Sequence, residues 1–172
     1  MNKLLKKLSF ALVAIMLVAF SSCGEPERDG YFVVGGRTYN IEDVTLKSTG
    51  YDDGYYQLLL TMEGVSRGEM ATLSFILYSD INGYLSSGVY TPYLNDMHYE
   101  HKFKRGEWTL SEETTPIYVG KVKVTNTKEV YEISIDSEDK KGMGVAAEFN
   151  GELEVIIWSI FPISLSSRKA YR

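Results

Sequence analysis

The chain has 172 residues, of which 44% are hydrophobic, 13% aromatic and 24% charged, and its formal net charge at pH 7 is −5. This is the composition of a folded protein, and the length suits one domain that can bury a core without cross-links. The acidic balance argues against nucleic acid as a partner, because binding to phosphates needs a basic face. A single cysteine excludes a disulfide within the chain.

The segment Met1–Gly24 follows the order of a secretory signal. Three lysines and no acid precede an apolar run from Leu8 to Phe20, and small polar residues then lead to Cys23. The run has 13 residues, whereas a transmembrane helix needs about 20. We therefore predict that residues 1–22 are an export signal and not a membrane-spanning helix.

The sequence Phe20-Ser21-Ser22-Cys23 resembles the lipobox of a bacterial lipoprotein signal. The resemblance implies cleavage before Cys23, acyl chains such as palmitate on the new first residue, and an outer-membrane lipoprotein that faces either the periplasm or the cell surface. The alternative is an ordinary secretory signal followed by a free thiol, which would be open to intermolecular oxidation. After cleavage 15 basic residues face 23 acidic ones, so the lipid rather than charge would hold the protein at the membrane.

Beyond the signal, the chain is predicted to divide into a tether, a domain and a tail. Residues 23–30 form the lipidated tether, because Gly24–Gly30 contains no core-forming residue. A single all-β domain is expected over residues 31–161. Residues 162–172 form a basic tail that starts at a proline and includes Arg168, Lys169 and Arg172.

From Tyr31 onward, apolar and polar residues alternate in short runs separated by turn residues, as in β-strands. Gly35-Gly36 and Asn150-Gly151 predict tight hairpin turns. The expected strands are Tyr31–Val34, Arg37–Lys47, Tyr55–Met62, Ala71–Ser79, His98–Lys104 and four built on the inward rows Val122–Val124, Tyr131–Ile135, Val145–Phe149 and Leu153–Ile157, with Val89–Tyr90 as a tenth.

So many strands in one domain must close into a barrel or fold into two packed sheets. The sequence predicts an all-β fold of about nine antiparallel strands, largely a meander. Two arrangements fit this description: a flattened up-and-down barrel of the lipocalin-like type, or a two-sheet β-sandwich. The sequential hairpins favour the barrel, and the long middle segment leaves room for a sandwich crossover.

The residue types that most often bind metals or act in catalysis do not form a recognisable motif in this sequence. His98 and His101 flank Glu100, but side chains three apart on a strand point to opposite faces, so no metal site is predicted. Asp80-Ile81-Asn82-Gly83 begins like a calcium loop and lacks the closing glutamate. No Gly-x-Ser-x-Gly motif occurs, and nothing nominates a catalytic pair of carboxylates. We therefore expect a protein that is not an enzyme and uses no cofactor.

The middle segment Ser79–Ser111 is the least regular part, and long loops on a β scaffold are where binding usually occurs. Its aromatic residues Tyr90, Tyr93, Tyr99 and Trp108 could present flat rings to a ligand, beside the basic run His101–Arg105. The alternative is that the rings pack on the core and that the lysines protect an exposed edge strand.

Taken whole, the chain resembles the small single-domain β lipoproteins of Bacteroidota, and the resemblance rests on Met1–Gly24 and implies only the lipidation of Cys23. We expect a membrane-anchored binding module for a glycan, a peptide or a partner protein. The alternatives are a lipocalin-like carrier of a small apolar ligand and a subunit of a surface assembly. An empty apolar interior would favour the carrier. A filled core with exposed aromatic rings would favour the binding module, and an unpaired strand edge would favour the surface assembly.

Overall fold

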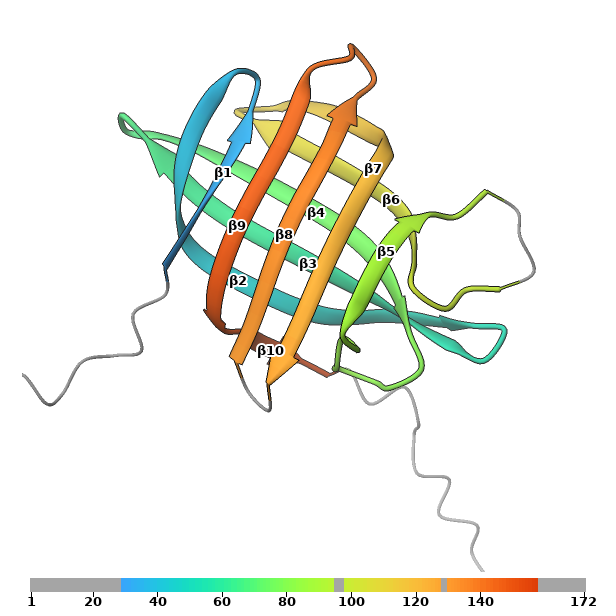
Figure 1. Ribbon diagram of the computed structural model, residues 1–172. Coiled ribbons are helices and arrows are strands. Elements are labelled where there is room, and N and C mark those ends of the chain that lie inside the picture. Colours follow the sequence, from blue (N-terminus) through green and yellow to red (C-terminus); the bar gives the residue numbers. More distant parts are fainter. Residues whose placement is uncertain (1–28, 95–97, 128–129, 158–172) are drawn as a thin grey trace, which may run out of the picture.

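The computed structural model describes residues 29–94, 98–127 and 130–157 (Figure 1); the predicted signal, Cys23 and the tail lie outside these residues. The described residues form an all-β fold. Its strands are β1 (Asp29–Val34), β2 (Arg37–Asp52), β3 (Tyr55–Ser66), β4 (Glu69–Ser79), β5 (Gly88–Pro92), β6 (Lys102–Leu110), β7 (Glu113–Thr127), β8 (Val130–Asp139), β9 (Gly144–Glu152) and β10 (Glu154–Ile156).

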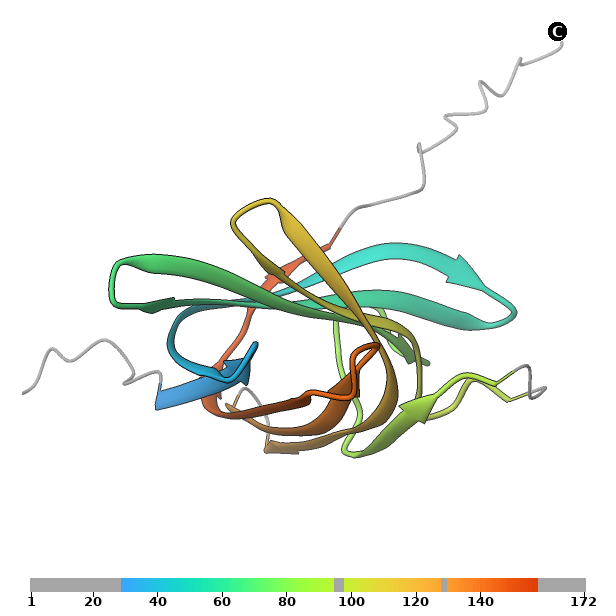
Figure 2. The same cartoon turned by 90° about the horizontal axis from the view of Figure 1, so that it is seen from above.

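Nine of the strands form a closed ring in the order β1-β9-β8-β7-β5-β6-β4-β3-β2, and the pairing of β1 with β2 closes it. Strand β10 pairs with β2 outside the ring. Figure 2 shows that the ring is flattened, with β2, β3 and β4 in one wall and β1, β8 and β9 in the other. The predicted all-β barrel is confirmed, and the strands do not separate into the two sheets of a sandwich.

Two pairings in the barrel are parallel, β5 with β6 and β10 with β2, whereas only antiparallel neighbours were expected. Strand β5 fits into the ring because β7 bends. The register of β7 against β8 shifts between Ile117 and Val119, and Gly120 has a φ of 124°. A Cβ at Gly120 would lie 2.3 Å from the Ser137 Oγ atom. Through this bend β7 pairs with β6 along its first part and with β5 along its second.

The prediction of a hairpin turn at Asn150-Gly151 is wrong. Both residues lie within β9, where Asn150 pairs with Asp29 on one side and with Glu132 on the other. Since β1 and β8 occupy both edges of β9, the next strand cannot continue the meander. The chain instead crosses to β2, where β10 pairs through Glu154–Ile156. By contrast, Gly35 and Gly36 form the predicted turn, with φ values of 57° and 74°.

Side chains from the ring strands fill the interior. Five aromatic side chains are no more than 1% exposed, namely Phe32, Tyr39, Phe75, Tyr90 and Phe103. Two glycines make room for such rings: a Cβ at Gly64 would lie 2.7 Å from the Phe32 ring, and one at Gly106 would lie 2.5 Å from the Phe75 ring. The centre of the barrel is therefore a packed core of interlocking rings.

The loop between β4 and β5 covers the lower end of the barrel in Figure 1. Leu85 in this loop is fully buried. Asn126 of β7 donates to the loop from its backbone N–H, to the Ser87 Oγ at 2.8 Å, and from its side-chain amide, to the Leu85 carbonyl at 3.4 Å. Residues of the β10 segment lie against Gly83, where a Cβ would be 2.9 Å from Ile157. The loop is thus fixed to the barrel from two sides.

Candidate functional site

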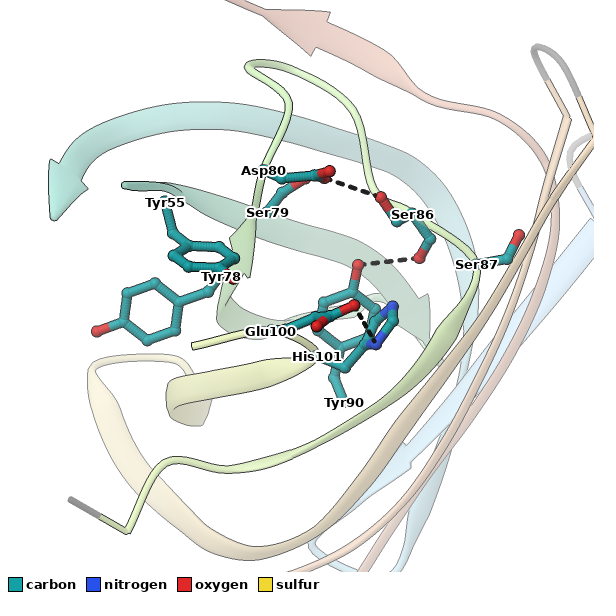
Figure 3. Close-up of a pocket in the computed structure, with 9 residues that line it drawn as sticks. All are labelled: Tyr55, Tyr78, Ser79, Asp80, Ser86, Ser87, Tyr90, Glu100 and His101. Carbon is teal, nitrogen blue, oxygen red and sulfur yellow. Dashed lines mark hydrogen bonds and ion pairs between the residues drawn. The ribbon is translucent and has the colours of Figure 1, made fainter. Parts of the chain in front are cut away.

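A pocket of about 300 Å³ lies beside this loop. Figure 3 shows that its walls come from the start of β3, the end of β4, the β4–β5 loop, strand β5 and the residues just before β6. The lining residues are Tyr55, Tyr78, Ser79, Asp80, Ser86, Ser87, Tyr90, Glu100 and His101.

The floor of the pocket is a fixed hydrogen-bonded layer. The Tyr90 hydroxyl donates to the Ser86 carbonyl at 2.9 Å, and the Ser79 hydroxyl donates to the Tyr84 carbonyl at 2.5 Å. Burial, with a further contribution from the charge of Asp80, raises the pKa of Tyr90 well above its ordinary value. The phenol therefore stays protonated at neutral pH and keeps its role as a donor.

The imidazole of His101 forms one wall of the pocket, and a glycine on the neighbouring strand leaves the space that the imidazole ring occupies. Its ring meets the Tyr90 ring edge-on at a centroid distance of 5.2 Å. A Cβ at Gly88 would lie 2.4 Å from two atoms of the imidazole, so this place on β5 admits no side chain. The Nδ1 atom of His101 is 4.0 Å from a carboxylate oxygen of Glu100.

Acidic groups lie along the opening. Asp80 accepts a hydrogen bond from the Ser86 hydroxyl at 3.1 Å, which fixes one carboxylate against the loop. The Glu100 side chain is 73% exposed. Neither lysine nor arginine is among the nine lining residues. The pocket thus presents carboxylates and hydroxyls to a ligand.

Four tyrosines, which we call the rim cluster, pack together beside the pocket: Tyr55, Tyr78, Tyr93 and Tyr99. Tyr55 and Tyr78 line the pocket, and Tyr93 and Tyr99 contact the buried Tyr78. The Tyr99 ring is at the centre, with centroid distances of 4.5 Å to Tyr78, 4.8 Å to Tyr93 and 5.9 Å to Tyr55. Tyr93 and Tyr99 are stacked at an interplanar angle of 8°. The neighbouring Tyr93 hydroxyl, desolvation and the charge of Asp52 together raise the pKa of Tyr99. The four rings belong to β3, β4 and the connection between β5 and β6.

The structure divides the four aromatic residues that the sequence nominated. Tyr93 and Tyr99 stack on each other in the rim cluster, and Tyr90 lines the pocket but is 0% exposed and belongs to the core. Trp108 is elsewhere: it is 7% exposed, and its indole N–H donates to Asp139 at 3.3 Å. Of the four rings, Tyr93 and Tyr99 form a contacting pair, whereas Tyr90 and Trp108 pack in the core as the alternative described.

The basic run also differs from what was expected. Strand β6 pairs with β4 on one side and with β7 and β5 on the other, so its lysines do not protect an edge. Lys104 and Arg105 are exposed on this strand. The ammonium group of Lys102 donates to the Thr91 hydroxyl at 3.2 Å, which links β6 to β5.

Of the nine lining residues, the sequence nominated Tyr90 alone for ligand binding. The eight others were missed, namely Tyr55, Tyr78, Ser79, Asp80, Ser86, Ser87, Glu100 and His101. The tyrosines were interpreted as ordinary strand residues. Both stand where a strand meets a turn, Tyr55 just after Asp53-Gly54 and Tyr78 just before Ser79-Asp80. Aromatic residues at strand ends are a signal that could have nominated them, because strand ends in a barrel lie around its openings.

Comparison with protein-family models, with curated proteins and with solved structures finds no match to this chain. Within the described ranges, no helix has the length and apolar character needed to cross a bilayer. Within the same ranges, no three histidine, cysteine, aspartate or glutamate side chains are grouped as for a metal ion. The site is therefore interpreted from its own geometry.

Proposed function

We propose that the protein is a membrane-anchored binding module, not an enzyme, and that its ligand site is the rim cluster with the adjoining pocket. The observation that carries this proposal is the convergence of four tyrosine rings beside a pocket of about 300 Å³ with a hydrogen-bonded floor. A glycan, a peptide or a partner protein is the class of ligand that such a surface suits.

The chemistry of tyrosine supports this use. Its ring offers a flat apolar face, its hydroxyl can donate or accept a hydrogen bond, and it loses little conformational freedom on binding. Ligand sites combine aromatic walls with a few well-placed polar groups. Here Asp80, Ser86 and His101 supply the polar groups.

Because the interior is filled, a ligand site at the rim is better supported than one inside the barrel, which a carrier would need. A barrel of this size can hold a small ligand inside. In this chain, however, the Phe32, Phe75 and Phe103 rings occupy the interior. A carrier of an apolar ligand would have to displace packed core side chains.

A surface assembly is the second candidate, favoured by one observation. Among the described strands, β10 has β2 as its single neighbour, and Val155, Ile156 and Ile157 beside it are 38 to 57% exposed. An added strand from another chain could pair with this edge. If so, a Val155→Asp variant would lose an oligomer that size-exclusion chromatography detects for the native chain.

Anchoring at the membrane is proposed from the N-terminal sequence. The lipobox-like Phe20-Ser21-Ser22-Cys23 supports lipidation at Cys23, which would place the barrel in the cell envelope at the outer membrane. The acidic chain needs such an anchor, because an excess of carboxylates is repelled by anionic lipid.

The site is tested by removing its central ring. The full-length chain, purified in a non-ionic detergent, is compared with a Tyr99→Ala variant on an array of glycans and peptides. Every ligand that the native chain retains should be lost or weakened at least about tenfold, because Tyr99 contacts the three other rings. Tyr118→Ala is the matched control, since Tyr118 is a 62% exposed tyrosine of β7 outside the site. A folded Tyr99→Ala protein that retains every ligand contradicts the proposal.

A further inference from the structure

We propose that the rim cluster and pocket bind an organic cation, meaning a ligand whose recognised group is an ammonium or guanidinium. This inference rests on the proposed function and specifies the ligand of the same site. Its basis is the combination, in one opening, of tyrosine faces with carboxylates that are directed to the same space.

The rings provide the first part of the recognition. The face of an aromatic ring carries partial negative charge and attracts a cation that lies within about 6 Å of its centroid. Tyr55 and Tyr78 line the pocket itself, and Tyr99 lies within 5.9 Å of the first and 4.5 Å of the second. Figure 3 shows the Tyr55 and Tyr78 rings together on one side of the pocket. A cationic group in the pocket could therefore contact Tyr55 and the small exposed part of Tyr78, which is 2% exposed and packs against Tyr99.

Carboxylates provide the second part. Asp80 and Glu100 line the pocket, and Asp52 lies directly across from Tyr55 in the pairing of β2 with β3. Burial and then the charge of Asp52 raise the pKa of Tyr78, which places that carboxylate within electrostatic reach of the rim cluster. Two acidic groups thus line the pocket, and a third lies on the strand that pairs with Tyr55.

The same charges disfavour an anionic ligand. A phosphate or carboxylate placed in the pocket would meet Asp80 and Glu100 with no lysine or arginine among the lining residues. A neutral sugar could stack on a ring and donate its hydroxyl hydrogens to the carboxylates, but it would gain no charge attraction from them. A cation uses both the rings and the carboxylates.

The test compares two probes that differ only in charge. Choline carries a trimethylammonium group, and 3,3-dimethylbutanol carries a neutral tert-butyl group of the same shape. Each is titrated into the full chain, labelled with carbon-13 in its tyrosine rings and held in an uncharged polyoxyethylene detergent. We expect choline to shift the ring signals of Tyr55, Tyr78 and Tyr99 saturably, with an affinity at least about tenfold above that of the neutral probe.

Variants separate the contributions of ring and charge. Tyr99→Phe keeps the ring face and should bind choline within about threefold of the native chain, whereas Tyr99→Ala should lose about tenfold. Asp80→Asn should also weaken choline binding and leave the neutral probe unchanged. Tyr118→Ala, remote from the site, should match the native chain.

Two outcomes would overturn the inference. If the native chain binds both probes equally, or shows no saturable shift with choline, the preference for a cation is refuted; this comparison requires no variant. Such a result leaves the proposed function standing if the array ligands still depend on Tyr99. If the array ligands do not depend on Tyr99, the proposed function fails as well.

Discussion

Asp139 at the end of β8 connects a turn to the core through one carboxylate. Its Oδ1 atom accepts hydrogen bonds from the backbone N–H groups of Lys141 at 2.7 Å and Met143 at 3.0 Å. Its Oδ2 atom accepts from the indole N–H of Trp108 at 3.3 Å. Ligand contact and packing on the core were the two alternatives for Trp108, and it lies in the core with its indole N–H bonded to Asp139.

Removing the Asp139 carboxylate should destabilise the barrel. In Asp139→Ala, two backbone N–H groups and the Trp108 indole lose their acceptor, and the expected loss is about 2 kcal/mol or more in the free energy of unfolding. Asp136→Ala is the matched control: this residue is also on β8, but its side chain is 81% exposed and pairs only with Lys121. The control should change stability by less than about 0.5 kcal/mol. Equal effects of the two changes in urea unfolding would contradict this role.

The pH dependence of stability gives an independent test of the same group. Burial alone would raise the pKa of Asp139, but the hydrogen bonds from Met143, Lys141 and Trp108 outweigh burial and hold the pKa below its usual range. An unfolded aspartate has a pKa of about 3.9. The stabilisation from Asp139 is therefore fully present above that pH and is lost as the pH falls toward the lower folded pKa.

We therefore expect the native chain to exceed Asp139→Asn in free energy of unfolding by a constant amount between about pH 5 and about pH 7. The difference should shrink below about pH 3.9. Denaturant unfolding at several pH values measures it. A difference that grows as the pH falls would reverse the sign of the proposed pKa shift.

Part of the candidate site could be predicted at this scale. Tyr93 and Tyr99 were nominated because they stand in the irregular middle segment, and they do lie at the rim. Tyr55 and Tyr78 stand at the open ends of the consecutive strands β3 and β4, and the register of this hairpin, which places Tyr56 opposite Ser79, brings them to the same end of the barrel. Alternation alone does not give that register, so their place at strand ends was the signal that could have nominated them.

Paired strands can pack closely where a glycine on one strand leaves room for a large side chain on the other. Gly106 of β6 pairs with Phe75 of β4, and the Phe75 ring lies where the glycine side chain would be. Phe75 in turn meets Phe103 edge-on at 5.3 Å. The packing of β4 against β6 thus depends on an absent side chain as much as on the apolar residues.

Adding one methyl group at this position should destabilise the barrel. Gly106→Ala would place a Cβ 2.5 Å from the Phe75 ring, and such overpacking costs about 1 to 3 kcal/mol. Gly144→Ala in β9 is the control, because a Cβ there meets nothing within 4 Å. Combining Gly106→Ala with Phe75→Leu should recover part of the loss. If Gly106→Ala is as stable as the control in denaturant unfolding, the interior is less closely packed than described.

The strands themselves were predicted better than their connections. Alternation of apolar residues identified segments of β1 to β4 and β7 to β9, because inward and outward side chains differ in each. The same pattern failed at Asn150-Gly151, since a turn signal carries no information about whether both strand edges are already occupied. Strand β6 was expected over His98–Lys104 and extends instead from Lys102 to Leu110.

At the level of the whole molecule, the choice between barrel and sandwich depended on contacts that no local pattern encodes. Closure requires β1 to pair with β2 and also with β9, which lies more than a hundred residues after β1 in the chain. The insertion of β5 between β6 and β7 depends on the bend at Gly120. Composition and alternation predicted the all-β class, and long-range pairing determined the architecture.

The proposed anchor predicts where the whole molecule is found in the cell. Mass spectrometry of the native protein should show a chain that begins at Cys23 and carries acyl groups. A Cys23→Ser variant should leave the membrane fraction, because no residue remains to carry the lipid. Ser22→Ala, a neighbouring change that keeps the cysteine, should remain with the membrane. An unmodified Cys23 thiol in the native protein would refute the anchor.

The central claim is that this barrel binds at its tyrosine rim while its interior stays filled. A crystal structure of the chain grown with millimolar choline tests both parts at once. We predict density for the cation over the Tyr55, Tyr78 and Tyr99 rings, with Phe75 and Phe103 still packed against each other in the core. Density for the cation enclosed among Phe32, Phe75 and Phe103, with the rim vacant, would contradict the account.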